Sequence, residues 1–319
     1  MSINKSNRRI DYLRISVTDR CNLRCSYCMP AEGIETVRPE ELLNFEEIAR
    51  LVNIFVNLGI KKVRITGGEP LVRKGLPRLL KAIANTKGIE EIALTTNGVL
   101  LPQYTQDLKE AGVRRLNISL DTLKEEKFKR ITLSPYFYNV MAGIDKAREL
   151  RFDKLKLNTV VMKGINDDEI IDFVKFAKSK SLILRFIEFM RVTPLWKEDL
   201  FIPIEEIKKI CEKKYKLERM ENPGPSPAEH YKVDGRPLLG FIKTDQNNCN
   251  RCSRLRLTSV GNLKICLYEN EGLSLKEFLR DRSSDREIFD MVRDKISLKE
   301  QVNYNSWQPA NTYMCSLGG

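Results

Sequence analysis

Three cysteines near the N-terminus are the residues of this chain with the clearest chemical potential. Cys21, Cys25 and Cys28 are separated by three and by two residues, so three thiols share one short tether. Three thiolates suit an iron–sulfur cluster that keeps one iron without a protein ligand, and such an iron is open to chemistry. Structural zinc is the alternative, but it needs a fourth Cys or His nearby, and His230 is the only histidine of the chain.

A second set of three cysteines lies near the C-terminus. Cys249 and Cys252 are separated by two residues, and thirteen more separate Cys252 from Cys266. The stretch between them reads as one hairpin, with strands at 254–258 and 262–265. This spacing fits zinc or iron, and with only three cysteines an iron–sulfur cluster is favoured.

Two arginines follow directly on the second of these cysteines. Arg254 and Arg256 alternate along one predicted strand, so both side chains point to the same face. Paired guanidinium groups form a fork that suits phosphates or the edge of a purine. A solvent-facing pair is the alternative, and the neighbouring cysteines favour a binding role.

The two remaining cysteines carry no such pattern. Cys211 lies in a helical pattern at 204–215 and Cys315 lies in the C-terminal tail, so we expect a packed thiol and an incidental one. A disulfide framework is not expected, because such frameworks belong to small secreted domains. Residues 1–9 lack an apolar signal segment, and no window approaches the roughly 18 apolar residues of a membrane span. The sequence predicts a soluble, cytoplasmic protein.

The charge of the chain is strongly basic. Its 55 Lys and Arg residues against 43 Asp and Glu residues give a net charge of +12. Both signs are mixed along predicted helices, as at 124–127, which favours solvated helix faces. A basic cleft that concentrates a small polyanionic substrate is the functional alternative. We expect neither a nucleic-acid partner nor a membrane partner.

The elements that must position these residues alternate between strands and helices from residue 10 to about 215. Six strands are predicted, at 12–17, 63–66, 92–95, 116–119, 154–161 and 182–189. The amphipathic helices between them include 45–57, 76–84, 138–150 and 167–179. Six βα units imply a parallel sheet that curls toward a barrel, and they are fewer than the eight of a closed barrel. We therefore predict an α/β fold, a partial TIM-like (β/α)6 barrel, over residues 1–220.

The pattern changes after residue 220. Residues 222–227 form a proline-rich connection, and short strand-like runs follow at 231–233, 238–243 and 255–257. We place the domain boundary near residue 220. Residues 221–319 are predicted to form a small α+β domain that closes the open side of the barrel.

Polar residues follow the predicted strands, and the C-terminal rim of a parallel barrel is where catalytic groups gather. Gly67 and Gly68 follow the second strand, and glycine lets the backbone approach a ligand closely. Later rim positions are Thr95, Ser119, Lys156, Asn158 and Met190. A lysine inside a barrel is costly unless an anion meets it. At each position the alternative is an ordinary structural role in a turn or in the core. Because all of these positions lie at the same rim, a functional role is favoured.

The segment CNLRCSYC over residues 21–28 resembles the signature loop of the radical S-adenosylmethionine (SAM) enzymes. In that superfamily the open iron chelates the methionine moiety of SAM. An electron from the cluster then cleaves SAM to methionine and a 5′-deoxyadenosyl radical.

The resemblance extends from about residue 12 to residue 319. The two cysteine sets, the pair Arg254 and Arg256, and the terminal Gly318 and Gly319 together resemble the GTP 3′,8-cyclase family, which opens molybdenum cofactor biosynthesis. Two glycines form a thin tail that can thread a crowded cavity, whereas fraying is the ordinary behaviour of a terminus.

The resemblance implies two 4Fe-4S clusters and SAM as cofactors. It assigns the SAM-cleaving cluster to Cys21, Cys25 and Cys28, with SAM contacts at Tyr27, Gly68, Ser119 and Met190. It assigns the guanine-binding cluster to Cys249, Cys252 and Cys266. The implied GTP-binding positions are Arg14, Arg64, Thr95, Lys156, Arg254 and Arg256. The implied catalytic set joins the first three cysteines with Arg254, Arg256, Gly318 and Gly319.

The implied reaction converts GTP to 3′,8-cyclo-7,8-dihydro-GTP. The deoxyadenosyl radical abstracts the ribose 3′ hydrogen, the new C3′ radical attacks C8 of guanine, and a second electron completes the product. An electron donor, a homodimer and a downstream cyclic pyranopterin monophosphate synthase are further implications. Two alternatives stay open. One is another radical SAM enzyme with an auxiliary cluster, such as a peptide-modifying maturase, and the other is a zinc or iron–sulfur protein that binds nucleic acid.

Overall fold

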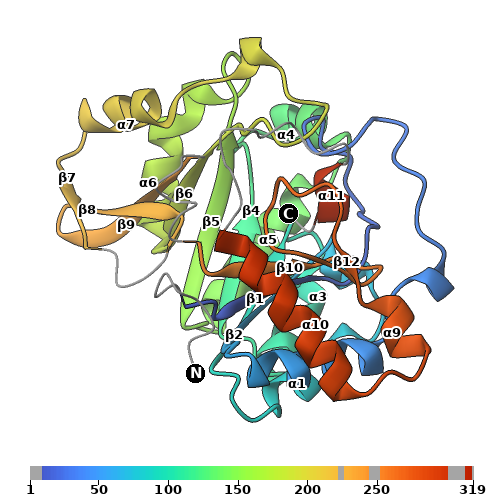
Figure 1. Cartoon of the computed structure of the whole chain (residues 1–319). Helices are drawn as coiled ribbons and strands as arrows, with labels where there is room; N and C mark the ends of the chain where they lie inside the picture. The colour runs from blue at the N-terminus through green and yellow to red at the C-terminus, as the bar shows by residue number, and fades with distance from the viewer. Residues whose placement is uncertain (1–8, 222–225, 244–251, 301–312, 318–319) are drawn as a thin grey trace.

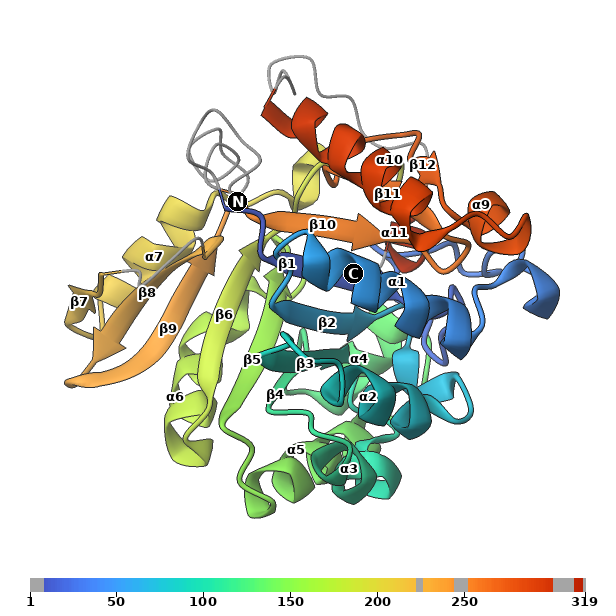
Figure 2. The same cartoon turned by 60° about the horizontal axis from the view of Figure 1, so that its bottom comes forward.

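The computed structural model describes residues 9–221, 226–243, 252–300 and 313–317. Three of the predicted site residues, Cys249, Gly318 and Gly319, lie outside these ranges. Within them, twelve strands form one sheet in the order β12-β11-β10-β1-β2-β3-β4-β5-β6-β9-β8-β7. Figure 2 shows the strands as one curved row.

Six parallel strands form the centre of the sheet. They are β1 (Tyr12–Ser16), β2 (Lys62–Thr66), β3 (Glu91–Thr96), β4 (Arg115–Ser119), β5 (Lys154–Val161) and β6 (Ile183–Glu188). Each end lies within one residue of its predicted position. Leu13 and Ile15 of β1 are fully buried, whereas Arg14 between them lines a cavity. The two-residue period of a strand thus separates the apolar core from the polar interior of the barrel.

Helices follow the central strands and cover the outer side of the curved sheet (Figures 1 and 2). They are α1 (Phe45–Asn57), α2 (Leu76–Ala84), α3 (Leu101–Glu110), α4 (Glu125–Thr132), α5 (Phe137–Glu149) and α6 (Ile170–Lys180). The predicted start of the last helix at Asp167 is a 3-10 turn, Asp167–Glu169. α1 begins with a capping box between Asn44 and Glu47, which satisfies backbone donors that a helix start leaves free.

The C-terminal part of the chain extends this sheet at both edges. β10 (Arg254–Leu257) pairs in parallel with β1, and β11 (Asn262–Lys264) and β12 (Leu273–Ser274) follow as antiparallel neighbours. At the other edge, β9 (Arg236–Ile242) pairs in parallel with β6, followed by β8 (Ala228–Val233) and β7 (Leu217–Arg219). The predicted hairpin after Cys252 is present, and the predicted α/β partial barrel is confirmed. The domain boundary near residue 220 stays a prediction.

The later helices pack against the barrel. They are α7 (Ile204–Glu212), α9 (Lys276–Arg280), α10 (Asp285–Ser297) and α11 (Met314–Leu317). Further 3-10 turns lie at Pro39–Glu41, Pro70–Val72, Glu198–Leu200 and Leu298–Glu300. Ion pairs join α1 to this region, with Arg50 Nε 2.7 Å from Asp285 Oδ1 and Arg280 Nε 2.9 Å from Glu47 Oε1. Cys211 is buried on α7, as the sequence predicts. No helix in the described ranges is long and apolar enough to cross a membrane.

Candidate active site

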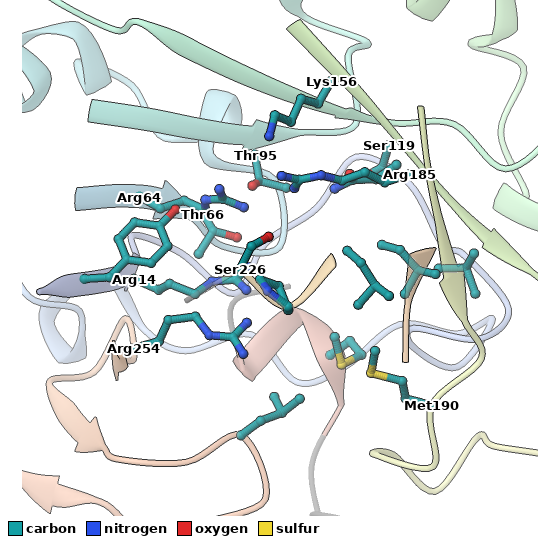
Figure 3. A pocket seen from close by; sticks show the side chains of 18 of the residues that line it. Arg14, Arg64, Thr66, Thr95, Ser119, Lys156, Arg185, Met190, Ser226 and Arg254 are labelled. Atoms are coloured by element: carbon teal, nitrogen blue, oxygen red, sulfur yellow. The ribbon is translucent and has the colours of Figure 1, made fainter. Parts of the chain in front are cut away.

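A cavity of about 670 Å³ lies inside the curve of the sheet. Figure 3 shows arginine side chains and hydroxyl groups converging on it from several strands. Cavities of roughly 300–1,000 Å³ are the usual size for sites that hold small molecules. Every predicted site residue in the described ranges lines this cavity: Arg14, Cys21, Cys25, Tyr27, Cys28, Arg64, Gly68, Thr95, Ser119, Lys156, Met190, Cys252, Arg254, Arg256 and Cys266.

The loop after β1 carries the first three cysteines. Backbone hydrogen bonds from Arg24 N to Thr132 O and from Ser26 N to Ile131 O, both 2.9 Å, hold this loop against the end of α4. The sulfur of Cys21 accepts hydrogen bonds from Leu23 N at 3.4 Å and from Asn97 Nδ2 at 3.7 Å. Hydrogen bonds to the sulfur atoms are one means by which proteins set the reduction potential of iron–sulfur clusters.

Burial and nearby carboxylates oppose ionisation of the thiols of this loop. Burial raises the pKa of Cys21 to about 11, and burial together with Asp121 raises the pKa of Cys25 well above its usual value. The thiols do not converge on the position of a single metal ion, in so far as the described residues show. A donor set of three cavity-lining thiols fits a cluster of several irons, whose positive charge stabilises the thiolates.

Gly67 and Gly68 permit a close approach of the neighbouring backbone. A Cβ atom on Gly68 would lie 2.4 Å from Arg20 O, and one on Gly67 would lie 2.7 Å from Thr18 O. The glycines therefore admit the backbone of the cysteine loop itself. Gly68 N donates to Thr18 O at 2.8 Å, which fixes the loop to the end of β2.

The carboxylate of Glu69 joins two segments at this rim, its own turn and the end of β3. It accepts hydrogen bonds from Leu71 N at 3.1 Å, Thr96 Oγ1 at 2.7 Å and Asn97 N at 2.7 Å. Burial raises the pKa of Glu69 to about 7 despite these bonds. Because Asn97 also reaches the sulfur of Cys21, the carboxylate positions the first cysteine from behind.

Tyr27 is held by a residue that the sequence did not single out. Its hydroxyl donates to Asp121 Oδ2 at 2.6 Å, and Asp121 Oδ1 accepts from Val160 N at 2.8 Å. The ring of Phe189 packs edge-on against Tyr27, with centroids 6.4 Å apart. Burial raises the pKa of Asp121 to about 6. The chain around residue 121 therefore fixes the orientation of the tyrosine.

The second cysteine set lies in more basic surroundings. Arg254 Nε donates to the sulfur of Cys252 at 3.4 Å. Burial alone would raise the pKa of Cys252, but Arg254 and Lys299 lower it to about 6. Lys299 also donates to the backbone carbonyl oxygens of Arg254 and Ile265, on the two strands of the hairpin. Cys252 and Cys266 both face the cavity, and this donor set fits an anionic iron–sulfur cluster.

Three predicted arginines lie side by side across neighbouring strands. Arg14 on β1 is in register with Arg64 on β2 and with Arg256 on β10. Burial and then Arg256 and Arg64 lower the pKa of Arg14 well below its usual value. Burial and then Arg254 lower the pKa of Arg256 to about 10. Neighbouring strands lie about 4.8 Å apart, so this row concentrates positive charge at one wall of the cavity.

The opposite wall carries a second group of cations. Burial, followed by Arg185 and Arg115, lowers the pKa of Lys156 to about 6. Burial and Arg64 lower the pKa of Arg185 to about 9. Within the described ranges, the Nε atoms of Arg64 and Arg185 are buried without a hydrogen-bond partner. Such an arrangement is stabilised by a bound polyanion.

Arg185 and His230 are among the cavity residues that the sequence reasoning missed. Arg185 interrupts the apolar residues 183–187 of β6, and that interruption was a usable signal. His230 lies on β8, and its approach to the cavity depends on pairing with β9. Sequence spacing gives no measure of such pairing between distant segments.

The expectation that Cys315 is an incidental thiol of the tail is wrong, because the residue packs inside the protein. Its side chain is buried and lines the cavity, and it forms a hydrogen bond with the thiol of Cys28. Met314 N also donates to Cys28 O at 3.3 Å. These contacts bring the C-terminal helix α11 against the first cysteine loop.

Comparisons with known families agree with this arrangement. The family model described as the radical SAM superfamily matches residues 15–177, and the one described as Molybdenum Cofactor Synthesis C matches residues 182–305. A curated protein of Thermodesulfovibrio yellowstonii named GTP 3′,8-cyclase is 46% identical over 318 residues, which cover 98% of each chain. A protein of the same name from Syntrophomonas wolfei is 45% identical and covers 99% of this chain and 100% of its own.

A longer relative and a more distant crystal structure are also similar to this chain. Molybdenum cofactor biosynthesis protein 1 of Dictyostelium discoideum is 41% identical over 98% of this chain and 51% of its own length. The crystal structure of Streptococcus suis SuiB bound to S-adenosylmethionine has a TM-score of 0.60, over 90% of this chain and 68% of that chain, at 16% identity. At this identity the likeness shows the fold alone.

The buried cations lead to a prediction about pH. The pKa of Lys156, about 6 in the folded protein, lies below the usual value of 10.5, so the unfolded chain binds more protons between these values. The free energy of unfolding therefore rises with pH across this interval, by at most about 1.4 kcal/mol per pH unit from this residue. Nucleotide-free Lys156→Met should be more stable than the wild type at pH 7, and the difference should shrink toward pH 9. Anaerobic urea unfolding at both pH values measures this.

The exposed Lys163 provides the matched control. Lys163→Met should leave the pH dependence of unfolding unchanged. An equal slope in Lys156→Met and the wild type would contradict the lowered pKa of the buried Lys156.

Proposed function

Because the chain belongs to the GTP 3′,8-cyclase family of the radical SAM superfamily, we propose that the residues of this cavity bind and cyclise GTP. The activity is the conversion of GTP to 3′,8-cyclo-7,8-dihydro-GTP in molybdenum cofactor biosynthesis. One observation carries the assignment of residues: thiols of both cysteine sets and two groups of buried cations line the same cavity of about 670 Å³. A nucleotide in it reaches both sets of thiols.

SAM and an iron–sulfur cluster belong to the superfamily, and we propose two 4Fe-4S clusters for this chain. Cys21, Cys25 and Cys28 hold the first, and Cys249, Cys252 and Cys266 hold the second. When bound, the first cluster and SAM supply the 5′-deoxyadenosyl radical that removes the ribose 3′ hydrogen. The SAM-contacting residues are Tyr27, Gly68, Ser119 and Met190, all of which line the cavity.

The cations orient GTP. Arg254 lies beside the sulfur of Cys252, so a guanine at the second cysteine set contacts this arginine. Arg14, Arg64 and Arg256 form a row next to it, and their delocalised charge suits phosphate oxygens. Thr95 and Lys156 extend the site along the barrel wall. Holding ribose and base in fixed positions lowers the entropy that cyclisation must otherwise lose.

The C-terminal tail completes the site in this proposal. The contact between Met314 N and Cys28 O brings the preceding helix to the SAM-binding loop. Gly318 and Gly319 follow this helix, and we propose that they enter the cavity and take part in catalysis. Glycine suits that role because it has no side chain to exclude the substrate.

The wider setting follows from the same family. We propose a cytoplasmic location, because reduced thiols and iron–sulfur clusters require a reducing compartment. An electron donor supplies the electrons, the active form is a homodimer, and a cyclic pyranopterin monophosphate synthase takes the product. The alternative considered from sequence, a peptide-modifying maturase, does not account for the near-full-length identity to the cyclases.

One assay tests the function. Anaerobically reconstituted protein is incubated with SAM, a reductant and each nucleoside triphosphate in turn, and products are read by mass spectrometry. We expect 5′-deoxyadenosine together with a GTP-derived product of altered retention. SAM cleavage with GTP unchanged would overturn the substrate, and absence of cleavage would overturn the radical mechanism.

Arg254→Ala tests the proposed GTP contact. Hydrogen bonds to charged groups contribute about 1.5–3 kcal/mol, so GTP affinity or turnover should fall at least tenfold. Formation of 5′-deoxyadenosine should persist, because the first cysteine set is untouched. Iron content must be measured, since Arg254 also donates to the sulfur of Cys252. Arg236→Ala is the control, because Arg236 is exposed and is not among the residues that line the cavity. An unchanged GTP dissociation constant and rate in Arg254→Ala would remove Arg254 from the site.

A chain that ends at Leu317 tests the tail. We expect it to retain the iron of both clusters but to lose most GTP cyclisation. A variant with alanine at both positions 318 and 319 separates the effect of length from the effect of side-chain bulk. Full activity of the truncated chain would show that the tail has no catalytic role.

A further inference from the structure

His230 faces the cavity but has no part in the function proposed above. It lies on β8 opposite Gly240 on β9, and Gly240 pairs with Arg185 on β6. A Cβ atom on Gly240 would lie 3.2 Å from Arg185 Cγ and 3.3 Å from His230 Nδ1. The glycine therefore leaves the space in which the stem of Arg185 and the imidazole ring meet.

Ser226 fixes the other side of the ring. Its Oγ lies 3.3 Å from His230 Nε2, and it accepts a hydrogen bond from Ala228 N at 3.2 Å. Figure 3 shows the Ser226 side chain among those that line the cavity. A hydroxyl has one proton to donate, so it serves either the ring nitrogen or a ligand in the cavity.

The charged groups facing this pair come from several strands. Arg185 on β6, Lys156 on β5 and Arg115 on β4 all act on His230, and burial together with these cations lowers its pKa to about 4. Arg115 is paired with Glu91 at 2.6 Å. On the β8 side Glu229 accepts from Tyr231 Oη at 3.0 Å, and beyond β7 Glu221 lines the cavity. At neutral pH the empty site therefore holds a neutral imidazole beside cations.

We propose that Ser226 and His230 form a recognition site for the phosphate end of the nucleotide, adjoining Arg185 and Lys156. The inference rests on the proposed function, since GTP supplies the phosphates. The neighbouring cations attract any anion. The serine and the histidine are directional hydrogen-bond donors, so they select the position of a phosphate oxygen. In the complex the Ser226 hydroxyl donates to a phosphate oxygen, and His230 Nε2 takes one proton from water and donates as well.

Ser226 and His230 would thus discriminate between nucleotides by the number of their phosphates. A nucleotide with three phosphates reaches beyond the arginine row to this site, and one with a single phosphate does not. Binding of the longer nucleotide is accompanied by uptake of a proton at His230. Lys156 also has a lowered pKa and takes up protons when an anion binds beside it. Only the difference in proton uptake between the wild type and a His230 variant therefore reports on the histidine.

His230→Phe tests the site because phenylalanine keeps the ring and removes both nitrogens. The dissociation constants of GTP and GMP are measured by anaerobic equilibrium dialysis on reconstituted, SAM-bound enzyme. We expect the variant to bind GTP about tenfold more weakly, as for loss of one hydrogen bond to a charged group, with GMP unchanged. His230→Gln, which retains a donor, should restore part of the GTP affinity.

Calorimetry at pH 7 in two buffers of different ionisation enthalpy counts protons. Wild type should take up more protons with GTP than either His230 variant does. Arg236→Gln at the exposed end of the same hairpin should behave as wild type in both measurements. If His230→Phe loses its iron, Ser226→Ala carries the same comparison of GTP with GMP.

The outcomes separate two failures. An unchanged ratio of GTP to GMP affinity in the folded His230 variant, or in Ser226→Ala, would overturn the phosphate site and leave the cyclase assignment standing. Failure of the wild type to bind GTP at all would overturn the proposed function itself.

Discussion

The constraint on which this structure depends is the burial of several like charges around one cavity. Arg14, Arg64 and Arg256 occupy neighbouring positions across three strands, and Lys156 and Arg185 face them from β5 and β6. In the absence of a ligand these cations repel one another and have lost water, as their lowered pKa values indicate. The apolar outer faces of the same strands must offset that loss, and in the proposed function a polyanionic nucleotide turns the repulsion into binding energy. Stability and substrate affinity therefore oppose each other at the same residues.

The curved sheet makes this arrangement possible because alternate residues of each strand have opposite tasks. Leu13 and Ile15 pack under the helices while Arg14 faces the cavity, and the pattern is repeated around the barrel. The C-terminal strands then bring their own residues into the same register. Arg256 joins the arginine row only because β10 pairs with β1, and His230 reaches the opposite wall only through β9. Continuity of one sheet across the chain, more than any single loop, assembles the site.

Local patterns were sufficient to predict much of this from sequence. The central strands alternate or form short apolar runs, and the cysteine spacing, the two glycines and the arginine pair are all contiguous signals. Residues such as Asp121, Arg185 and His230 were missed because their roles arise from contacts between distant segments. At Gly68 the structure adds a close contact with the backbone of residues 19–20, which the sequence pattern did not indicate. Likewise, the tail position of Cys315 gave no sign that it packs against Cys28.

The two cysteine sets differ in a way that follows from their surroundings. Near the first set, burial and the carboxylate of Asp121 oppose ionisation of Cys25, and burial raises the pKa of Cys21 to about 11. Near the second set, Arg254 and Lys299 overcome burial and bring the pKa of Cys252 to about 6. The protein itself therefore stabilises a thiolate at the second set, whereas the first set relies on the charge of bound iron. In the proposed function SAM binds at the first set and GTP at the second. The carboxylates Glu69 and Asp121 near the first set would then suit the positively charged sulfonium of SAM, and the cations near the second set would suit a nucleotide with a triphosphate.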